Sequence, residues 1–145
     1  LLEIESGKYM KSVNISTPEI PNDGSVISIE NSTFSNCDNI TSITLPSGLK
    51  SIGNGSFSDC SKLTSLKIPS SVVVIYGPSF YGCDALASLE FEDVNNWHNI
   101  YTGDLDEYDY GVVEWSSTDF AANINILKSN TQLYTGIGYL IKKDN

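Results

Sequence analysis

The sequence predicts an α/β repeat solenoid, made mostly of a parallel β ladder with short helical turns and followed by a small C-terminal α+β cap. One segment is written three times, as STFSNCDNITSITLP from Ser32, GSFSDCSKLTSLKIPS from Gly55 and PSFYGCDALASLEFE from Pro78. The copies are 23 residues apart. This periodicity stops after Phe91, so residues 92–145 are expected to form a different structure.

Alignment of the copies at the 23-residue shift keeps apolar residues in the same positions. The shared columns are Phe34, Phe57 and Phe80; Cys37, Cys60 and Cys83; Ile40, Leu63 and Leu86; Ile43, Leu66 and Leu89; Leu45, Ile68 and Phe91; Val26, Leu49 and Val72; and Ile29, Ile52 and Ile75. A fixed period of about 20 to 29 residues with apolar positions spaced as L-x-x-L-x-L is the signature of stacked leucine-rich-repeat coils. Because one coil is too small to bury its own apolar side chains, a continuous core forms only through repetition.

A strand is predicted in each of the ranges 42–45, 65–68 and 88–91, where outward polar and inward apolar residues alternate. Stacked coils would join these strands in a parallel ladder with a spacing of about 4.8 Å. Pro46 and Pro69 end the strand, since proline cannot donate to a ladder. Glu92 stands at that position in the third copy, so the chain is expected to leave the solenoid there.

Two further turns are expected in each coil. Leu49 and Ile52 are three residues apart, as are Val72 and Ile75, and this spacing favours an inward-facing turn over a flat strand. A short helical or 3-10 turn is predicted around the phenylalanine.

Residues 1–25 are expected to form a degenerate first repeat. Its apolar residues Ile4, Met10, Val13 and Ile15 have the internal spacing of Phe57, Leu63, Leu66 and Ile68. The stretch of residues 16–25 would then contain a seven-residue insertion with two prolines, forming a surface loop. An alternative register places Ile20-Pro21 at the end of the strand. We prefer the first register because it explains four apolar residues. Residues 26–91 form the three regular repeats.

The pattern TSITLPSGLKSIGNGSFSDCSKL resembles the treponemal-type, or BspA-like, leucine-rich repeat, whose unit runs strand, Ile-Pro, a short apolar turn, then Phe, two residues and Cys. Three copies match across residues 26–91, although Ser56 and Ser79 stand where the family commonly has Ala. The resemblance implies a right-handed solenoid. Members are mostly bacterial cell-surface or secreted proteins, with relatives in some mucosal protists, and several are implicated in adhesion. The resemblance therefore implies an extracellular or cell-surface location, and it transfers no catalytic or binding residue.

Residues 92–145 are expected to cap the open end of the solenoid, which would otherwise expose core and ladder edges. Ser117 and Thr118 are candidate N-caps of one helix, whose apolar side would carry Phe120, Ile124 and Leu127. The stretch YTGIGYLIKK alternates as a late strand would. This arrangement also resembles the C-terminal cap of BspA-like proteins. We expect repeats and cap to form one structural domain.

Charge and hydropathy exclude several functions. With 18 acidic and 8 basic residues, the net charge of −10 opposes binding to nucleic acid or anionic lipid. No apolar stretch approaches the roughly 20 residues that span a bilayer, so no membrane insertion is expected. The chain begins with Leu1, and LLEIESGKYMKSV has no signal-peptide pattern. We expect that an N-terminal segment, with any export signal, has been removed.

Catalysis and metal binding are not expected. The three cysteines share one column, where side chains point the same way, which favours buried thiols over disulfides or a zinc site. His98 is the only histidine, and no G-x-S-x-G, P-loop or H-E-x-x-H motif accompanies it. The acidic stretch around Asp104 to Asp109 could hold calcium, but its spacing fails the EF-hand pattern. We therefore predict no enzyme activity, metal or cofactor.

Two surfaces are candidate binding sites. The first is the outward face of the ladder, with Ser42, Thr44, Ser65, Lys67, Ser88 and Glu90. The second is an aromatic and acidic cap loop suited to stacking on a glycan, with Trp97, Tyr108, Tyr110 and Trp115. We expect a monomer that binds protein partners of the extracellular matrix or cell surface. The alternatives are a glycan-binding cap loop, a structural terminal stalk of a longer surface protein, or a hydrated ladder that binds nothing.

Overall fold

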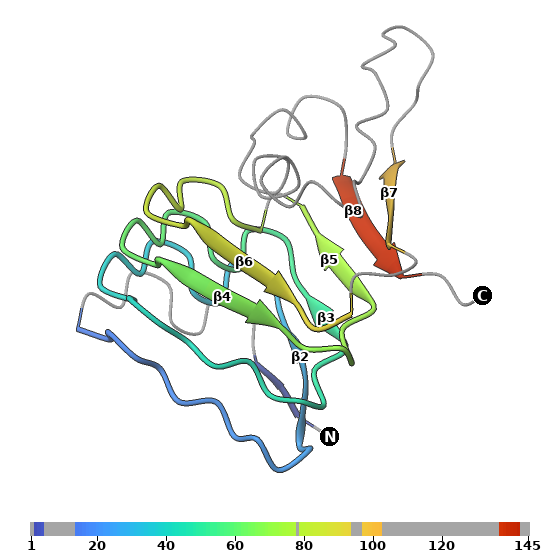
Figure 1. The fold of residues 1–145 in the computed structure, drawn as a ribbon, viewed down its shortest axis with the longest axis horizontal. Coiled ribbons are helices and arrows are strands. Elements are labelled where there is room, and N and C mark those ends of the chain that lie inside the picture. The colour runs from blue at the N-terminus through green and yellow to red at the C-terminus, as the bar shows by residue number, and fades with distance from the viewer. Residues whose placement is uncertain (1, 5–13, 78, 94–96, 103–136, 143–145) are drawn as a thin grey trace, which may run out of the picture.

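The computed structural model of the 145-residue chain describes residues 2–4, 14–77, 79–93, 97–102 and 137–142. These ranges contain eight strands and no helix: β1 (Leu2–Ile4), β2 (Val26–Ile29), β3 (Ser51–Ile52), β4 (Ser65–Ile68), β5 (Val74–Tyr76), β6 (Ser88–Phe91), β7 (Trp97–Thr102) and β8 (Ile137–Lys142). Successive coils of the chain stack on one another (Figure 1). We number their described residues coil 1 (2–4 and 14–25), coil 2 (26–48), coil 3 (49–71) and coil 4 (72–77 and 79–91).

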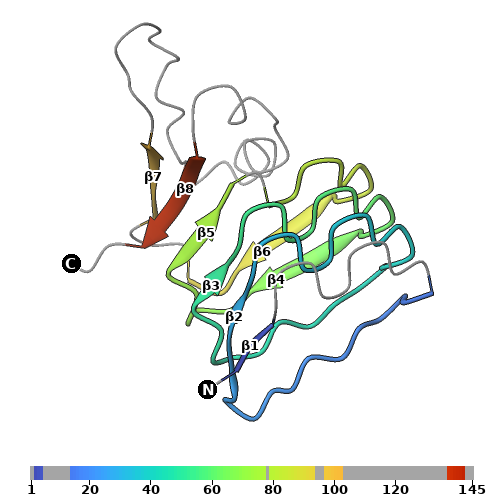
Figure 2. The same ribbon diagram turned by 180° about the vertical axis from the view of Figure 1, so that it is seen from behind.

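Two parallel ladders run across the stacked coils, on two sides of the core (Figure 2). In the first, β1, β2, β3 and β5 are neighbours in that order. The second joins β4 to β6, with Ser65 opposite Ser88 and Lys67 opposite Glu90, which confirms the predicted strands of coils 3 and 4. The third predicted strand, at 42–45, is not formed, although exposed and buried residues alternate there as predicted.

The first ladder corrects the prediction of a second inward-facing turn. Leu49 and Val72 do lie in turns, since their N–H groups donate to Pro46 O and Pro69 O at 3.0 and 3.1 Å. Ile52, however, is in a strand and pairs with both Ile29 and Ile75. Hydrogen bonds between coils, which the spacing within one coil does not reveal, hold the chain extended at this point.

The segment between the two ladders consists of consecutive turns where the sequence predicts a short helix. Cys37 N donates to Phe34 O at 3.2 Å, and Cys60 N donates to Phe57 O at the same distance. Asn36, Asp59 and Gly82 occupy one column and have φ angles of 58°, 61° and 72°. A left-handed residue in each of coils 2 to 4 stops helix propagation, and Asn, Asp and Gly are the residues that adopt this conformation most readily.

The core lies between the ladders and is built from matching columns. Phe34, Phe57 and Phe80 are fully buried. Their rings stack in parallel, with centroids 5.3 Å apart for the first pair and 5.5 Å for the second. Backbone hydrogen bonds support the column, since Phe34 N donates to Ser56 O at 2.8 Å and Phe57 N donates to Ser79 O at 2.9 Å. The core therefore forms between coils, as the repetition predicts.

Serine precedes the phenylalanine in coils 3 and 4, where the repeat that the sequence resembles commonly has alanine, and its hydroxyl joins two coils. Ser56 Oγ donates to Gly53 O in its own coil and also lies 3.2 Å from Glu30 O in coil 2. Ser79 Oγ repeats the arrangement with Tyr76 O and with Gly53 O, the latter at 3.1 Å. Because both hydroxyls are buried and hydrogen-bonded, serine is accommodated at this position.

Coil 1 follows the alternative register, and the preferred one is wrong. Ile4 lies opposite Ile29, so it does not occupy the phenylalanine column. Thr41 N donates to Ser16 O at 2.9 Å, and Ser47 N donates to Asn22 Oδ1 at 2.8 Å. Each of these pairs is 25 residues apart. At this shift Ile20-Pro21 aligns with Leu45-Pro46, as the alternative register requires.

The insertion in coil 1 is therefore two residues long and not seven. It lies in the corner between Pro21 and Val26, where Gly24 has a φ of 82°. Ser25 N donates to Asp23 Oδ1 at 2.9 Å, and the Ser25 hydroxyl donates to the same oxygen. These hydrogen bonds, that from the hydroxyl first, lower the pKa of Asp23 below its ordinary value. The extra residues are thus held as a local turn.

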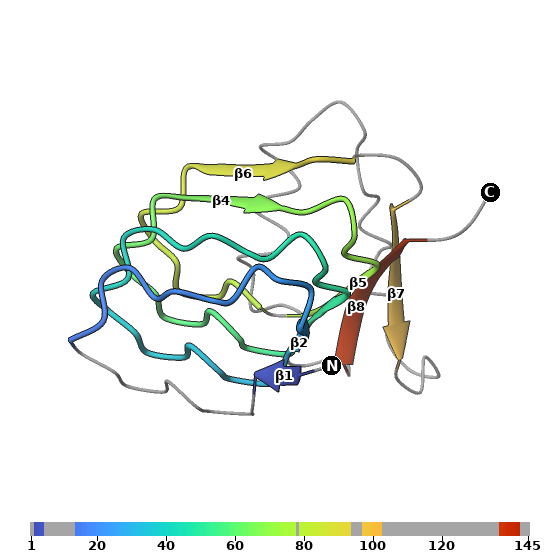
Figure 3. The same cartoon turned by 90° about the horizontal axis from the view of Figure 1, so that it is seen from below.

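The late strand predicted near the C-terminus is confirmed as β8. It pairs antiparallel with β5, with Leu140 opposite Ile75, and β7 pairs antiparallel with its other edge. Figure 3 shows β8 and β7 beside the end of the stacked coils. The helix predicted around residues 117–127 lies outside the described residues, and the cap as a whole stays a prediction. None of the described residues forms a helix long and apolar enough to cross a membrane.

Candidate functional site

The six residues predicted for the outward face are all exposed, on the side of the molecule that carries β4 and β6. With the corrected register of coil 1, they extend into two rows that cross all four coils. The rows are Thr17, Ser42, Ser65 and Ser88, and Glu19, Thr44, Lys67 and Glu90. All eight side chains are exposed, and we call these residues the outward face. Leu66 and Ile68, which alternate with them, are 4% and 1% exposed, so the core fixes the shape of the surface.

A small charge cluster lies at the coil 4 end of the outward face. Lys67 Nζ lies 3.7 Å from Glu90 Oε1 and 3.4 Å from Glu92 Oε1. Ser70 N donates to Glu92 Oε2 at 2.9 Å. This backbone hydrogen bond, followed by the proximity of Lys67, lowers the pKa of Glu92 below its ordinary value. Glu92 thus stands at the position of Pro46 and Pro69, and its carboxylate binds the backbone of the neighbouring coil at Ser70.

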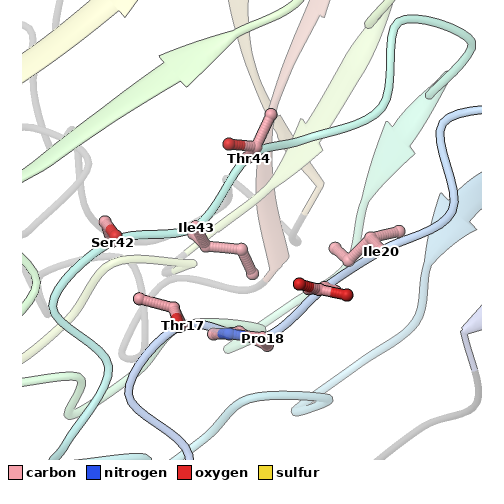
Figure 4. A pocket seen from close by; sticks show the side chains of 7 residues that line it. Thr17, Pro18, Ile20, Ser42, Ile43 and Thr44 are labelled. Atoms are coloured by element: carbon pink, nitrogen blue, oxygen red, sulfur yellow. The ribbon is translucent and has the colours of Figure 1, made fainter.

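A hollow of about 340 Å³ opens at the opposite end of the outward face, between coils 1 and 2. Its lining residues are Thr17, Pro18, Glu19, Ile20, Ser42, Ile43 and Thr44. Figure 4 shows the side chain of Ile43 projecting into the space between the two chain segments. Hydroxyl groups and one carboxylate make up most of the exposed lining, around the side chains of Pro18, Ile20 and Ile43. Sequence reasoning did not find the hollow, although the alternative register would have brought these residues together.

Pro18 explains why the hollow forms here. At the 25-residue shift it occupies the column of Ile43, Leu66 and Leu89, where every other coil has a branched aliphatic side chain. Proline also has no N–H to donate to a ladder. No strand is formed at 14–20 or at 42–45, whereas β4 and β6 pair over four residues. The missing ladder and the smaller side chain leave space beside Ile43.

The second candidate site is described only in part. Trp97 lies in β7 opposite Lys142, and His98 lies opposite Ile141. Tyr108, Tyr110 and Trp115 lie outside the described residues, as do the acidic residues from Asp104 to Asp109. The glycan-binding cap loop therefore stays a prediction.

The cysteine column is part of the core. Cys37, Cys60 and Cys83 are fully buried thiols, as predicted, and no disulfide joins them. The thiol of Cys60 donates to Phe34 O at 3.2 Å, and that of Cys83 donates to Phe57 O at 3.0 Å. Burial, followed by the neighbouring Cys83 and Cys37, raises the pKa of Cys60 above its ordinary value. In the part of the chain that the structure describes, no group of three or more His, Cys, Asp or Glu residues could hold a metal ion.

We expect these thiols to react with Ellman's reagent only after unfolding, because the thiolate is the reactive form and burial disfavours it.

The raised pKa of Cys60 also makes the stability of the fold depend on pH. The stabilisation that comes from keeping the Cys60 thiol protonated is fully present when the pH is below the thiol's ordinary pKa. It is lost as the pH rises from there towards the folded-state pKa, because only the unfolded chain then releases the proton. Thiol titration of the native protein at pH 8 tests the first prediction. Urea unfolding at pH 7 and pH 10 tests the second, and the free energy of unfolding should be lower at pH 10. Rapid native labelling would contradict the first prediction.

Comparison with known proteins agrees with this architecture. Residues 2–105 match the family described as the BspA type leucine-rich repeat region (6 copies). No curated protein and no solved structure matches the chain significantly. The match begins in β1 and includes all four coils, which carry the columns of the repeat. It covers more than half of the chain, and we conclude that this protein belongs to the BspA-type leucine-rich repeat family.

Proposed function

We propose that this chain is a protein-interaction module that binds its partner through the outward face. Leucine-rich repeats of this type suggest a module for protein interaction. The observation that carries the proposal is the pair of exposed rows that cross four coils above a buried, stacked core. Repeat solenoids commonly bind macromolecules through such extended surfaces.

The chemistry of the outward face supports binding to protein. Five of its eight side chains are Ser or Thr, which donate and accept hydrogen bonds and lose less conformational entropy on binding than long side chains. Its one cation, Lys67, is held by two carboxylates. A partner would therefore meet a surface whose shape is set by the buried residues between the rows.

The proposed setting is the cell surface or the extracellular space, as is typical of this family. The partner would be a protein of the extracellular matrix or of a neighbouring or host cell, so that binding produces adhesion. The module would act as a monomer and without catalysis. A rigid terminal stalk of a longer surface protein remains the structural alternative, and the hydrogen bonds between successive coils suit that role as well.

Binding of the 145-residue chain to an array of extracellular-matrix proteins, cell-surface proteins and glycans tests the proposal. We expect Ser65→Arg and Lys67→Glu to weaken a protein signal about tenfold, equivalent to about 1.4 kcal/mol, because each changes the centre of the outward face. Lys50→Glu makes the same charge change at an exposed position beside β3, on the other ladder, and is the control. Melting temperatures should be unchanged in Ser65→Arg and Lys50→Glu, and somewhat lower in Lys67→Glu, because its new carboxylate would lie beside those of Glu90 and Glu92.

Other results of the array would reassign the function. Equal binding by Ser65→Arg, Lys67→Glu and the unmodified chain would contradict the use of the outward face. A glycan signal that is lost in Tyr108→Ala would move the function to the predicted cap loop. The absence of binding to any protein or glycan on the array would favour the structural stalk.

A further inference from the structure

We infer that the hollow between coils 1 and 2 binds one aliphatic side chain of the partner protein, with an adjacent Lys or Arg of that partner paired to Glu19. This inference rests on the proposed function and names the chemistry that the outward face recognises. The hollow lies within that face, since Thr17, Ser42, Glu19 and Thr44 belong both to its lining and to the two exposed rows.

The hollow is a gap in an aliphatic column. Ile43, Leu66 and Leu89 occupy this column in coils 2 to 4, at 8%, 4% and 4% exposure, whereas coil 1 has Pro18. Ile20 is partly buried and packs against the core. A Leu, Ile or Val side chain entering from a partner would fill the space beside Ile43 and remove apolar surface from water. Its backbone would lie at the level of the surrounding hydroxyl groups.

The charge at the rim of the hollow determines which residue of the partner can lie next to the bound aliphatic side chain. Glu19 is exposed and contributes the only carboxylate of the lining. Within the part of the chain that the structure describes, no ion pair forms at Glu19, in contrast to Glu90 and Glu92, which both approach Lys67. The chain as a whole carries a net charge of −10. A basic residue beside the aliphatic side chain therefore fits both the rim and the overall field.

A small probe tests this without the natural partner. Titration of the ¹⁵N-labelled full chain with N-acetyl-Leu-Lys-amide is expected to shift the amide signals of residues 17–20 and 42–44, with a Kd on the order of millimolar for so small a ligand. N-acetyl-Leu-Glu-amide should bind more weakly because its charge opposes Glu19. Shifts confined to other residues, or equal binding of both dipeptides, would overturn the inference.

Matched variants separate the two parts of the site. Glu19→Lys is expected to reverse the preference between the two dipeptides, while Asp84→Lys, the same reversal of charge at an exposed position of coil 4 outside the outward face, should leave it unchanged. Pro18→Leu restores the aliphatic column and should abolish the shifts while preserving the native amide spectrum. Glu19→Gln should weaken the Lys-containing probe about two- to fivefold, as expected for one exposed ion pair. A Glu19→Lys variant that keeps the original preference would contradict the role of Glu19.

The inference and the proposed function fail in different ways. Loss of protein binding in Ser65→Arg with no effect of Pro18→Leu would retain the outward face as the interaction surface and reject the hollow as its anchor point. Dipeptide binding at the hollow with no response on the array would retain the subsite and reject the proposed protein partner class.

Discussion

Replacing Phe57 by alanine is expected to lower the free energy of unfolding by about 3–5 kcal/mol. Phe57 is fully buried between Phe34 and Phe80, with ring centroids 5.3 and 5.5 Å away. Its removal leaves a cavity and breaks two stacking contacts at once. The coils on either side cannot close the gap easily, because backbone hydrogen bonds hold them in register. Urea unfolding followed by circular dichroism gives the measurement.

The control for Phe57→Ala is Ser61→Ala, at an exposed position four residues further along the same coil. We expect its free energy of unfolding to stay within about 0.5 kcal/mol of the unmodified chain. A Phe57→Ala variant as stable as this control would show that the stacked rings contribute little to the core.

Gly53→Ala is expected to destabilise the fold by about 1–3 kcal/mol or more, through overpacking. A Cβ at Gly53 would lie 2.6 Å from both the backbone N of Asn31 and the backbone C of Glu30. Since neither atom belongs to a flexible side chain, coils 2 and 3 would have to move apart. That movement would strain the hydrogen bond from Gly53 N to Ile29 O, now 2.7 Å long. Thermal and urea unfolding of the variant test this.

Gly48→Ala provides the matched comparison for Gly53→Ala. A Cβ there would meet its nearest atom, the Cα of Gly24, at an ordinary contact distance of 3.6 Å. We expect stability to be unchanged or to rise by about 0.4–1 kcal/mol, because alanine restricts the unfolded chain. Equal losses in the two variants would mean that crowding between coils does not determine the effect at Gly53.

The regular repeats could be predicted from the sequence because each column repeats the same side-chain chemistry. Phe34, Phe57 and Phe80 identify the period, and the alternation of polar and apolar residues around Leu66 identifies β4 as a strand. The exposed residues of the outward face in coils 2 to 4 follow from the same alternation. These features depend on which residues recur and at what spacing, and both can be read directly from the sequence.

The register of coil 1 could not be obtained in the same way. Counting apolar matches favoured Ile4 in the phenylalanine column, but the backbone pairing of Ile4 with Ile29 determines the register. Pro18 then stands in an aliphatic column, a substitution that lowers the score of the correct alignment. The hollow was missed for the same reason, since it exists only where the correct alignment puts proline beside Ile43.

The type of turn around the phenylalanine could not be predicted from the spacing of apolar residues either. A helical turn and a series of reverse turns bury the same residues, and the difference lies in the backbone conformation of Asn36, Asp59 and Gly82. The recurrence of Asn, Asp and Gly in one column was the available signal, because these residues tolerate a positive φ. Ser32 and Gly55 form a second column of residues with positive φ, at angles of 55° and 64°.

The corner after the proline column sets where this architecture tolerates extra length. Coil 1 accommodates two additional residues between Pro21 and Val26, yet Ile4 and Ile29 stay paired and Val26 remains buried. Coil length is therefore independent of the columns at this one point. A foreign epitope grafted between Ser47 and Gly48 would project from the corner without entering either ladder. The same freedom makes the solenoid a display scaffold in which loops can be diversified while the underlying stack is kept.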